Sequence, residues 1–118
     1  LLTGNVSEMA RIKLSSFGVY ERFAWGAFGE EAADRDALAR LAVRRAAERH
    51  GVTADRCIVV GDTEHDIACA RAAGASVVAV ATGGRSAERL AEHGPDLVLR
   101  DLTETRPLWE WVGHSFQV

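Results

Sequence analysis

The chain has few of the residues that mark several common classes of protein. Cys57 and Cys69 are its only cysteines, and neither lies in a CxxC or Cys/His pattern typical of zinc or redox sites. Lys13 is the only lysine, and the net charge is -3, so no basic field favours nucleic acid or an anionic membrane. No apolar run approaches the roughly 20 residues that cross a bilayer. We expect a cytoplasmic protein that binds neither nucleic acid nor membrane.

Familiar catalytic signatures are also absent. The sequence contains neither GxGxxG nor GxxxxGK[ST], and the pair Gly83-Gly84 is too generic to indicate a nucleotide-binding loop. No Ser/His/Asp or Cys/His arrangement is evident. There is no internal repeat, linker or recognisable signal peptide. The 118 residues, 47% of them apolar, are one domain's worth of chain, or part of one, and a complete domain of this length can form an ordinary core.

Short apolar runs alternate with amphipathic stretches, a pattern typical of βα units in a parallel sheet. The clearest buried strand is 57–60, because it is short, continuous and followed at once by Gly61 and Asp62. Further strands are expected at 1–3, 23–28, 76–81 and 97–99. Helices are expected at 6–17, 36–50, 64–73, 86–93 and 103–112, with caps at Asn5 and Ser86, ends at Gly18, Gly51 and Gly74, and Trp109 and Val112 docked on the body. The expected fold is a three-layer, Rossmann-like α/β domain.

Polar residues follow the expected strands, where open parallel sheets bind their ligands. They are Thr3-Gly4-Asn5, the loop 34–36 with Arg35, the segment 61–66, and the loop 82–85. Together they offer a hydroxyl, an amide, a guanidinium, a carboxylate cluster and a glycine-rich loop. Such a set suits a phosphate bound together with a divalent metal.

Asp62 and Asp66 are the strongest candidates for metal ligands. Asp62 follows a strand and Asp66 lies about one helical turn later, so both can face the same point above the sheet. Carboxylate oxygens with waters are the ligands that Mg²⁺ prefers. The structural alternative is a capping box, in which Asp66 reaches back to Thr63 at the start of a helix. Capping does not account for Asp62, which precedes the cap.

Thr3 and Arg35 each allow two interpretations. The Thr3 hydroxyl at a strand end, followed by Gly4 and Asn5, can donate to a phosphoryl oxygen, or the segment is simply a turn into a capped helix. Arg35 places a cation at a helix N-terminus, where the helix dipole disfavours it. A bound anion would account for that position, and a solvated loop arginine is the alternative.

These motifs together resemble those of the haloacid dehalogenase (HAD) superfamily, particularly its phosphoglycolate-phosphatase-like hydrolases. Residues 2–5 resemble the second family motif, whose Ser or Thr holds the phosphoryl group. Residues 61–67 resemble the fourth, GDxxxD, which supplies acidic Mg²⁺ ligands. Arg35 fits the Lys or Arg of the third motif, whereas Lys13 lies too early. The resemblance spans nearly the whole chain, including residues 70–75 and 81–84.

The first family motif, DxDxT, is absent. In the family its first Asp is the nucleophile and its second is the general acid/base. Residues 34–36 spell DxD, but they follow a polar segment and lack the Thr. We therefore expect the motif, its central strand and the cap to lie upstream of Leu1, so that residues 1–118 form the C-terminal portion of a HAD-like core. The family's sheet would place the missing strand between residues 1–3 and 57–60, leaving a gap with exposed apolar faces.

The resemblance implies a Mg²⁺-dependent phosphohydrolase that acts on a small phosphorylated metabolite, a phosphomonoester, through an aspartyl-phosphate. Thr3 and Arg35 are implied to be catalytic, with Gly4 and Asn5 helping to bind phosphate, and Asp62 and Asp66 to be the Mg²⁺ ligands. The fragment alone is expected to be inactive.

Two alternatives remain open. One is a phosphonatase or phosphomutase relative, which would differ chiefly in the cap; dehalogenases do not use Mg²⁺, so the GDxxxD pair disfavours that branch. The other is a non-catalytic interaction module that pairs with a copy of itself, as a homodimer, or with its own missing N-terminal segment.

Overall fold

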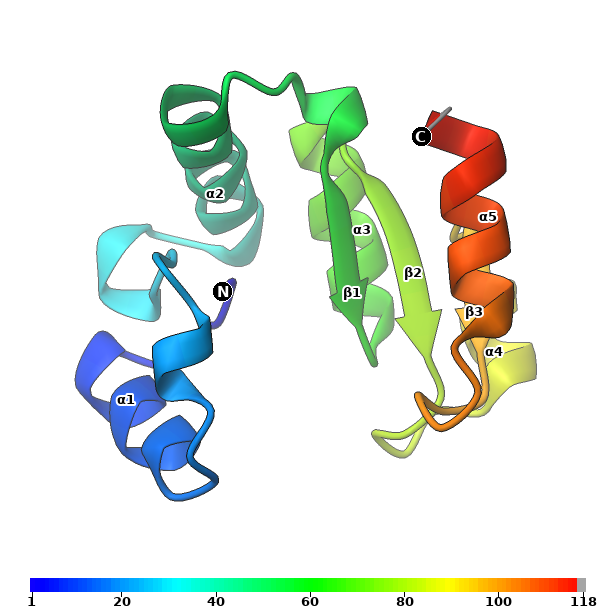
Figure 1. Cartoon of the computed structure of the whole chain (residues 1–118), viewed down its shortest axis with the longest axis horizontal. Helices are drawn as coiled ribbons and strands as arrows, with labels where there is room; N and C mark the ends of the chain where they lie inside the picture. The colour runs from blue at the N-terminus through cyan, green and yellow to red at the C-terminus, as the bar shows by residue number, and fades with distance from the viewer. Residues whose placement is uncertain (117–118) are drawn as a thin grey trace.

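The computed structural model describes residues 1–116, which form helices and three strands in alternation. The elements are α1 (Ser7–Ser15), α2 (Arg35–His50), β1 (Ile58–Gly61), α3 (Glu64–Ala73), β2 (Ser76–Val80), α4 (Ala87–Ala91), β3 (Leu97–Leu99) and α5 (Arg106–Phe116), with short 3-10 turns η1 (Tyr20–Arg22), η2 (Gly29–Glu31) and η3 (Ala54–Arg56) (Figure 1). Within this described part, no helix combines the length and apolarity needed to cross a membrane.

The three strands form a parallel sheet in the order β1-β2-β3. Parallel neighbours require a crossover connection, and α3 and α4 supply these two crossovers. The register places Val59 beside Val77 and Val78 beside Leu97. Strand β2 is central and is buried on both faces, which accounts for its continuous apolar run. The Rossmann-like α/β class expected from the sequence is confirmed.

Helices cover both faces of this sheet, giving three layers (Figure 1). On one face, residues of α3 and α4 pack on alternate residues of β2: Ile67, Ala70 and Leu90 with Val77 and Ala79. On the other face, α5 covers β2 and β3: Leu108 and Trp111 lie on Val78, Val80 and Leu99. Helix α2 packs chiefly against α3. The core is therefore centred on β2.

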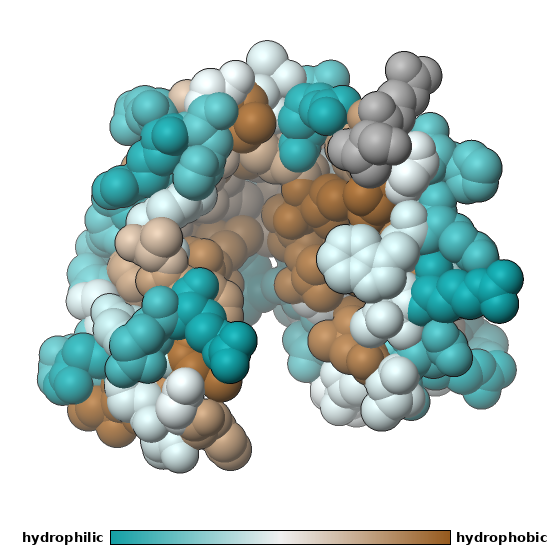
Figure 2. Space-filling model, viewed as in Figure 1, coloured by the Kyte–Doolittle hydropathy of each residue, from teal (hydrophilic) through white to brown (hydrophobic). Residues whose placement is uncertain are grey.

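The N-terminal residues do not join this sheet. Leu2 makes an isolated parallel bridge to Ala27, in which the Thr3 N–H donates to the Ala27 carbonyl (3.1 Å) and the Ala27 N–H donates to the Leu1 carbonyl (2.8 Å). A cavity of about 510 Å³ separates this bridge from β1. Its lining is largely apolar: Leu1, Leu2, Phe23, Trp25, Ala39, Ala42, Val43, Ala46, Cys57, Ile58, Val59 and Val60, with Asp66. Figure 2 shows this hollow between the two halves of the molecule. The expected gap in the sheet is present.

Strand backbone borders the cavity on both sides. The Cys57 carbonyl accepts from the Ser76 N–H (3.0 Å), so odd-numbered residues of β1 direct their backbone groups toward β2. By alternation, the backbone groups of Ile58 and Val60 point into the cavity, and Val60 is 53% exposed. The backbone N–H and carbonyl of Leu2 likewise point away from Ala27, because Leu1 and Thr3 make the hydrogen bonds of that bridge. The cavity is therefore bordered on two sides by backbone groups with the spacing that pairs with a parallel strand.

Two expectations for the N-terminal part are wrong. The segment 23–28 is not a strand, since Ala27 alone forms a bridge there and Leu2 is the partner. A ladder needs a neighbouring strand along its length, and the short segment at Leu2 does not supply one. Asn5 does not cap α1: the first helical N–H, of Ser7, donates to the Glu30 carboxylate (3.0 Å) brought in from η2. A carboxylate from a distant part of the chain stabilises a helix N-terminus as a local capping residue does.

The last helix begins three residues later than expected and docks differently. The Asp101 carboxylate accepts from the Thr103 N–H (2.9 Å) and hydroxyl (2.6 Å), and this local turn delays the helix until Arg106. Trp109 is 64% exposed, so the expectation that it docks on the body is wrong. Trp111 occupies that place instead and meets the Phe116 ring edge to face at 5.6 Å between centroids.

Asp96 links the two strand connections and allows a test of pH dependence. Its carboxylate accepts from the Val77 N–H (2.8 Å) and from Arg71 (2.9 Å). Partial burial raises the pKa of Asp96, but the Val77 N–H and the Arg71 guanidinium outweigh it, so the pKa lies below its ordinary value of 3.8. This stabilisation is complete above about pH 4 and is lost as the pH falls through the lowered, folded-state pKa.

We expect Asp96→Asn to lower the free energy of unfolding by about 1 kcal/mol near neutral pH. The deficit should shrink as the pH falls below about 4, because the wild-type carboxyl then becomes neutral as well. Urea unfolding of both proteins across this pH range measures it, with Glu92→Gln, at an exposed position of the sequence, as the control. A deficit that stays constant down to about pH 2 would contradict the assignment.

Candidate active site

The turn between β1 and α3 is organised by one carboxylate. Oδ2 of Asp66 accepts hydrogen bonds from the Asp62 N–H, the Thr63 N–H and the Thr63 hydroxyl, each at 3.0 Å. The capping role considered for Asp66 is therefore present. Gly61 lets the carboxylate come this close, because a Cβ at that position would lie 2.3 Å from Cγ of Asp66.

Arg35 reaches the same carboxylate from a different helix. Asp34 caps α2 through the Ala37 N–H (2.8 Å), which places Arg35 at the first helical position. From there Nη1 of Arg35 donates to Oδ1 of Asp66 at 2.9 Å, with the arginine side chain 49% exposed. The cation at the helix N-terminus thus has an anionic partner, and within residues 1–116 its other N–H groups donate to no protein acceptor.

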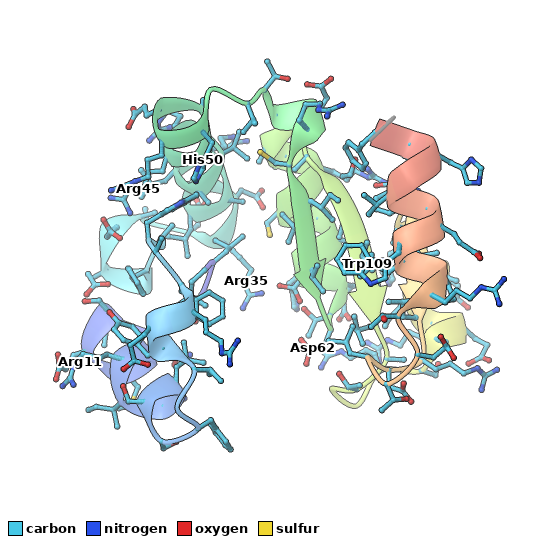
Figure 3. The ribbon with its side chains drawn as sticks, viewed as in Figure 1. Arg11, Arg35, Arg45, His50, Asp62 and Trp109 are labelled. Carbon is cyan, nitrogen blue, oxygen red and sulfur yellow. The ribbon has the colours of Figure 1, made fainter. Side chains whose placement is uncertain are left out.

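Asp62 differs from Asp66 in having an available carboxylate. Within residues 1–116 its side-chain oxygens accept no hydrogen bond, although its backbone is fixed by Asp66. The backbone of Gly83 lies directly against it, since a Cβ at Gly83 would be 1.8 Å from Oδ2 of Asp62. Figure 3 shows Asp62 after β1 and Arg35 at the start of α2, on either side of the opening. Asp62 therefore has oxygen lone pairs to offer a ligand.

Thr3 is held by its own turn. The Thr3 hydroxyl oxygen accepts from the Asn5 N–H and from the Asn5 side-chain amide, both at 3.1 Å. The hydroxyl proton remains free to donate. Gly29 packs against this turn so closely that a Cβ there would lie 2.0 Å from the Gly4 carbonyl oxygen, and its N–H donates to the Asn5 carbonyl (2.9 Å).

A second cavity, of about 150 Å³, lies where these segments meet. Its lining is Leu2, Thr3, Gly4, Arg35, Leu38, Asp62, Thr63, Asp66 and Cys69. Five of the six site residues predicted from the sequence therefore border one space, and the sixth, Asn5, holds Thr3 beside it. The residues come from the N-terminal turn, the start of α2 and the turn after β1.

The donor set is compatible with a Mg²⁺ ion. Mg²⁺ is commonly held by one or two carboxylates and retains several waters, and Asp62 and Asp66 are two carboxylates on one turn. No cluster of three or more His, Cys, Asp or Glu side chains with metal-site geometry occurs among residues 1–116. The described residues thus offer two carboxylates to a Mg²⁺ ion and no complete cage.

Glu64, a residue to which no sequence motif assigns a role, forms an ion pair in the structure. Oε2 of Glu64 accepts from Nε of Arg85 at 3.0 Å, and Arg89 lies 3.4 Å from Oε1. The hydrogen bond from Arg85 lowers the pKa of Glu64 to about 2. Arg85 lies in the loop 82–85, which follows β2 as expected from the sequence. No sequence pattern predicts that it pairs with Glu64.

A model of HAD-hydrolase-like proteins matches residues 37–105, which include β1, the turn with Asp62 and Asp66, and the whole sheet. The chain belongs to the HAD-hydrolase-like family. It is 35% identical over 112 residues to the phosphoglycolate phosphatase of Xanthomonas campestris pv. campestris (strain 8004), a match that covers 93% of this chain and 48% of that protein. This HAD-like chain thus spans about half the length of that curated relative.

Solved structures share the fold of this HAD-like chain. A hydrolase from Pseudomonas syringae superposes with a TM-score of 0.71 at 21% identity, covering 88% of this chain and 49% of that one. A HAD family hydrolase from Deinococcus radiodurans R1, solved with bound phosphate and sodium, superposes with a TM-score of 0.68 at 24% identity, covering 95% and 51%. Each of these solved chains is about twice as long as the part that matches.

The close approach of Gly83 to Asp62 makes a sharp test of the site's packing. In Gly83→Ala the added methyl and the Asp62 carboxylate cannot occupy their present positions together, so one of them must shift. We expect a loss of about 1–3 kcal/mol in the free energy of unfolding, measured by urea denaturation. The matched control is Gly113→Ala in α5, where a Cβ meets nothing within 4 Å and helix propensity favours alanine by about 1 kcal/mol. Equal effects of the two substitutions would contradict this packing.

Proposed function

We propose that the intact protein is a cytoplasmic, Mg²⁺-dependent phosphatase that hydrolyses a small phosphorylated metabolite, a phosphomonoester. The observation that carries the proposal is the convergence of a free hydroxyl, a guanidinium and two carboxylates on the cavity of about 150 Å³. Family membership and the relative named phosphoglycolate phosphatase support the reaction class. The phosphate in the Deinococcus radiodurans structure supports a phosphate-binding role for the same fold.

The N-terminal turn and Arg35 would bind the phosphoryl group. Asn5 directs two donors to the Thr3 oxygen, so the Thr3 hydroxyl donates its own proton to a phosphoryl oxygen. Arg35 keeps one N–H on Asp66 and offers others to the phosphoryl oxygens, whose negative charge it offsets. Gly4 allows the backbone to approach the same group. Positioning and charge neutralisation supply most of the catalysis in such transfers.

Asp62 and Asp66 would hold the Mg²⁺ ion. Asp62 has unengaged oxygens, and Asp66, although bonded to Arg35 and to the turn, retains lone-pair capacity on Oδ1. When bound, Mg²⁺ neutralises charge on the phosphoryl oxygens and orients them. The Asp66 hydrogen bonds to the Asp62 and Thr63 amides fix the backbone of the turn that carries both carboxylates before the ion binds.

The nucleophile would come from a segment outside residues 1–118. An aspartate oxygen on that segment attacks phosphorus as the bond to the substrate's alcohol oxygen breaks, and the alcohol leaves with a proton from a general acid. Water then cleaves the aspartyl-phosphate and releases inorganic phosphate and the carboxylate. The cavity of about 510 Å³ supports this proposal, because a strand parallel to β1 within it would end beside Asp62 and Thr3.

The same cavity favours a second candidate function. Residues 1–118 would serve as a non-catalytic half domain that binds an added strand. That strand would come from a segment upstream of Leu1 or from a second copy of the chain. The open backbone edges at Leu2 and at Ile58 and Val60 favour this interaction role. A phosphonatase or phosphomutase would use the same site residues, and product analysis distinguishes these reactions from phosphomonoester hydrolysis.

Replacement of Asp62 in the intact protein tests the proposed function. We expect Asp62→Asn to lower kcat/KM for Mg²⁺-dependent hydrolysis of p-nitrophenyl phosphate by about 10²–10⁴-fold, since it removes a charged metal ligand while leaving the turn's backbone bonds. Asp55→Asn, at the exposed turn η3 before β1, is the control and should keep the wild-type rate. A nearly unchanged rate in Asp62→Asn would rule out the metal assignment.

A further inference from the structure

The loop between β2 and α4 is joined to the acidic turn, residues 62–66, by an ion pair that has no part in the proposed reaction. Nε of Arg85 donates to Oε2 of Glu64 at 3.0 Å, and its Nη2 lies 3.4 Å from Oε1. The two side chains are 30% and 18% exposed, so this pair is better shielded from solvent than the Arg106–Glu110 pair on α5, whose side chains are 81% and 58% exposed. The ion pair therefore anchors the loop 82–85 to the start of α3.

The same loop touches Asp62 directly. Gly83 lies two residues before Arg85 in the chain, and its backbone lies against the Asp62 carboxylate, where a Cβ would come within 1.8 Å of Oδ2. The loop thus makes two contacts with the acidic turn: an ion pair with Glu64 and a steric contact with Asp62. Loosening the first contact frees the segment that makes the second.

The negative charges of the acidic turn also favour the contact with Arg85. Three carboxylates, those of Asp62, Glu64 and Asp66, stand within five consecutive residues, and like charges at this spacing repel. The hydrogen bond and attraction to Glu64 raise the pKa of Arg85, and attraction to Asp62 and Asp66 adds to this. Arg85 is therefore a cation that is attracted to all three carboxylates of the turn.

We propose that Arg85, anchored by Glu64, is a positioning residue that holds Asp62 toward the cavity so that Asp62 and Asp66 can share one divalent cation. The inference rests on the proposed function for the identity of that cation as Mg²⁺. Arg85 and Glu64 act through the position of Asp62 and touch neither substrate nor metal. Their effect should therefore appear in the Mg²⁺ requirement and not in the rate at saturating Mg²⁺.

The test compares Arg85→Met with Arg85→Lys in the intact protein. We expect Arg85→Met to raise the Mg²⁺ concentration for half-maximal p-nitrophenyl phosphate hydrolysis about tenfold, with kcat at saturating Mg²⁺ changed by less than about threefold. Arg85→Lys should recover part of the loss, because it keeps the charge but not the forked geometry. Glu64→Gln should act in the same direction, and the double variant should be no worse than the stronger single one.

Arg71→Met is the matched control. Arg71 also joins α3 to a neighbouring segment, pairing with Asp96 at 2.9 Å at the end of the helix away from the site. It should lose stability and leave the Mg²⁺ requirement within about twofold of wild type. If Arg85→Met behaves like Arg71→Met, losing stability with an unchanged Mg²⁺ requirement, the positioning proposal is overturned.

Direct titration with MgCl₂ separates the two proposals. An intact protein that hydrolyses no phosphomonoester but binds Mg²⁺, with weaker binding in Arg85→Met by calorimetry, overturns the proposed function and supports the positioning role. Equal Mg²⁺ affinity in wild type and Arg85→Met overturns the positioning role whether or not hydrolysis is seen. An intact protein that binds no Mg²⁺ overturns both.

Discussion

The carboxylate of Asp66 is the interaction on which the candidate site depends. Its two oxygens accept from Asp62, Thr63 and Arg35, so one side chain closes the turn after β1, begins α3 and holds the start of α2. Hydrogen bonds to a carboxylate are stronger than those between neutral groups. Because α2 packs chiefly on α3, this contact also sets where the N-terminal half lies relative to the sheet. Capping and site assembly are thus one interaction, and the two interpretations of Asp66 are compatible.

Close backbone approach is the second constraint on the site. Gly61, Gly83 and Gly29 each occupy a position where a Cβ would come within 2.3 Å of an Asp66, Asp62 or Gly4 atom. The backbone at these positions can therefore pack directly against residues that line the space of about 150 Å³. Larger residues at these positions would spread the loops apart. The glycines act here through the space they leave, because none of the three has a positive φ.

The parts that the sequence predicted well are those stabilised by local interactions. β1 and α3 follow from a continuous apolar run, a turn with its own capping residues and a glycine C-cap, all within residues 57–74. The convergence of Thr3 and Asp62 was also predictable, because parallel strands present their C-terminal ends at one edge. Arg35 follows no strand in the structure and reaches this edge from the start of α2. Whether these residues bind phosphate and Mg²⁺ stays a prediction.

The parts that the sequence did not predict depend on long-range partners. The helix α1 takes its cap from Glu30, 23 residues away, and the Glu64–Arg85 pair spans 21 residues. The segment 23–28 has a strand-like composition, but strand formation requires a neighbour, and Leu2 offers a single bridge. Trp109 and Trp111 both fit an apolar helix face, and their sequence spacing does not decide which one meets β3.

The large cavity and the site are coupled through the same elements. Leu2 borders both spaces, and so does Asp66, so the separation between the N-terminal turn and β1 sets the distance from Thr3 to Asp62. In this structure α2 joins the two sides of the cavity, because it packs on α3 and also contacts η2. In a continuous sheet, backbone hydrogen bonds hold neighbouring strands about 4.8 Å apart. A strand seated between Leu2 and Ile58 would replace the softer constraint with the stiffer one. The occupant of the cavity would thereby fix the N-terminal turn with Thr3 relative to the acidic turn, in addition to any side chain that it contributes.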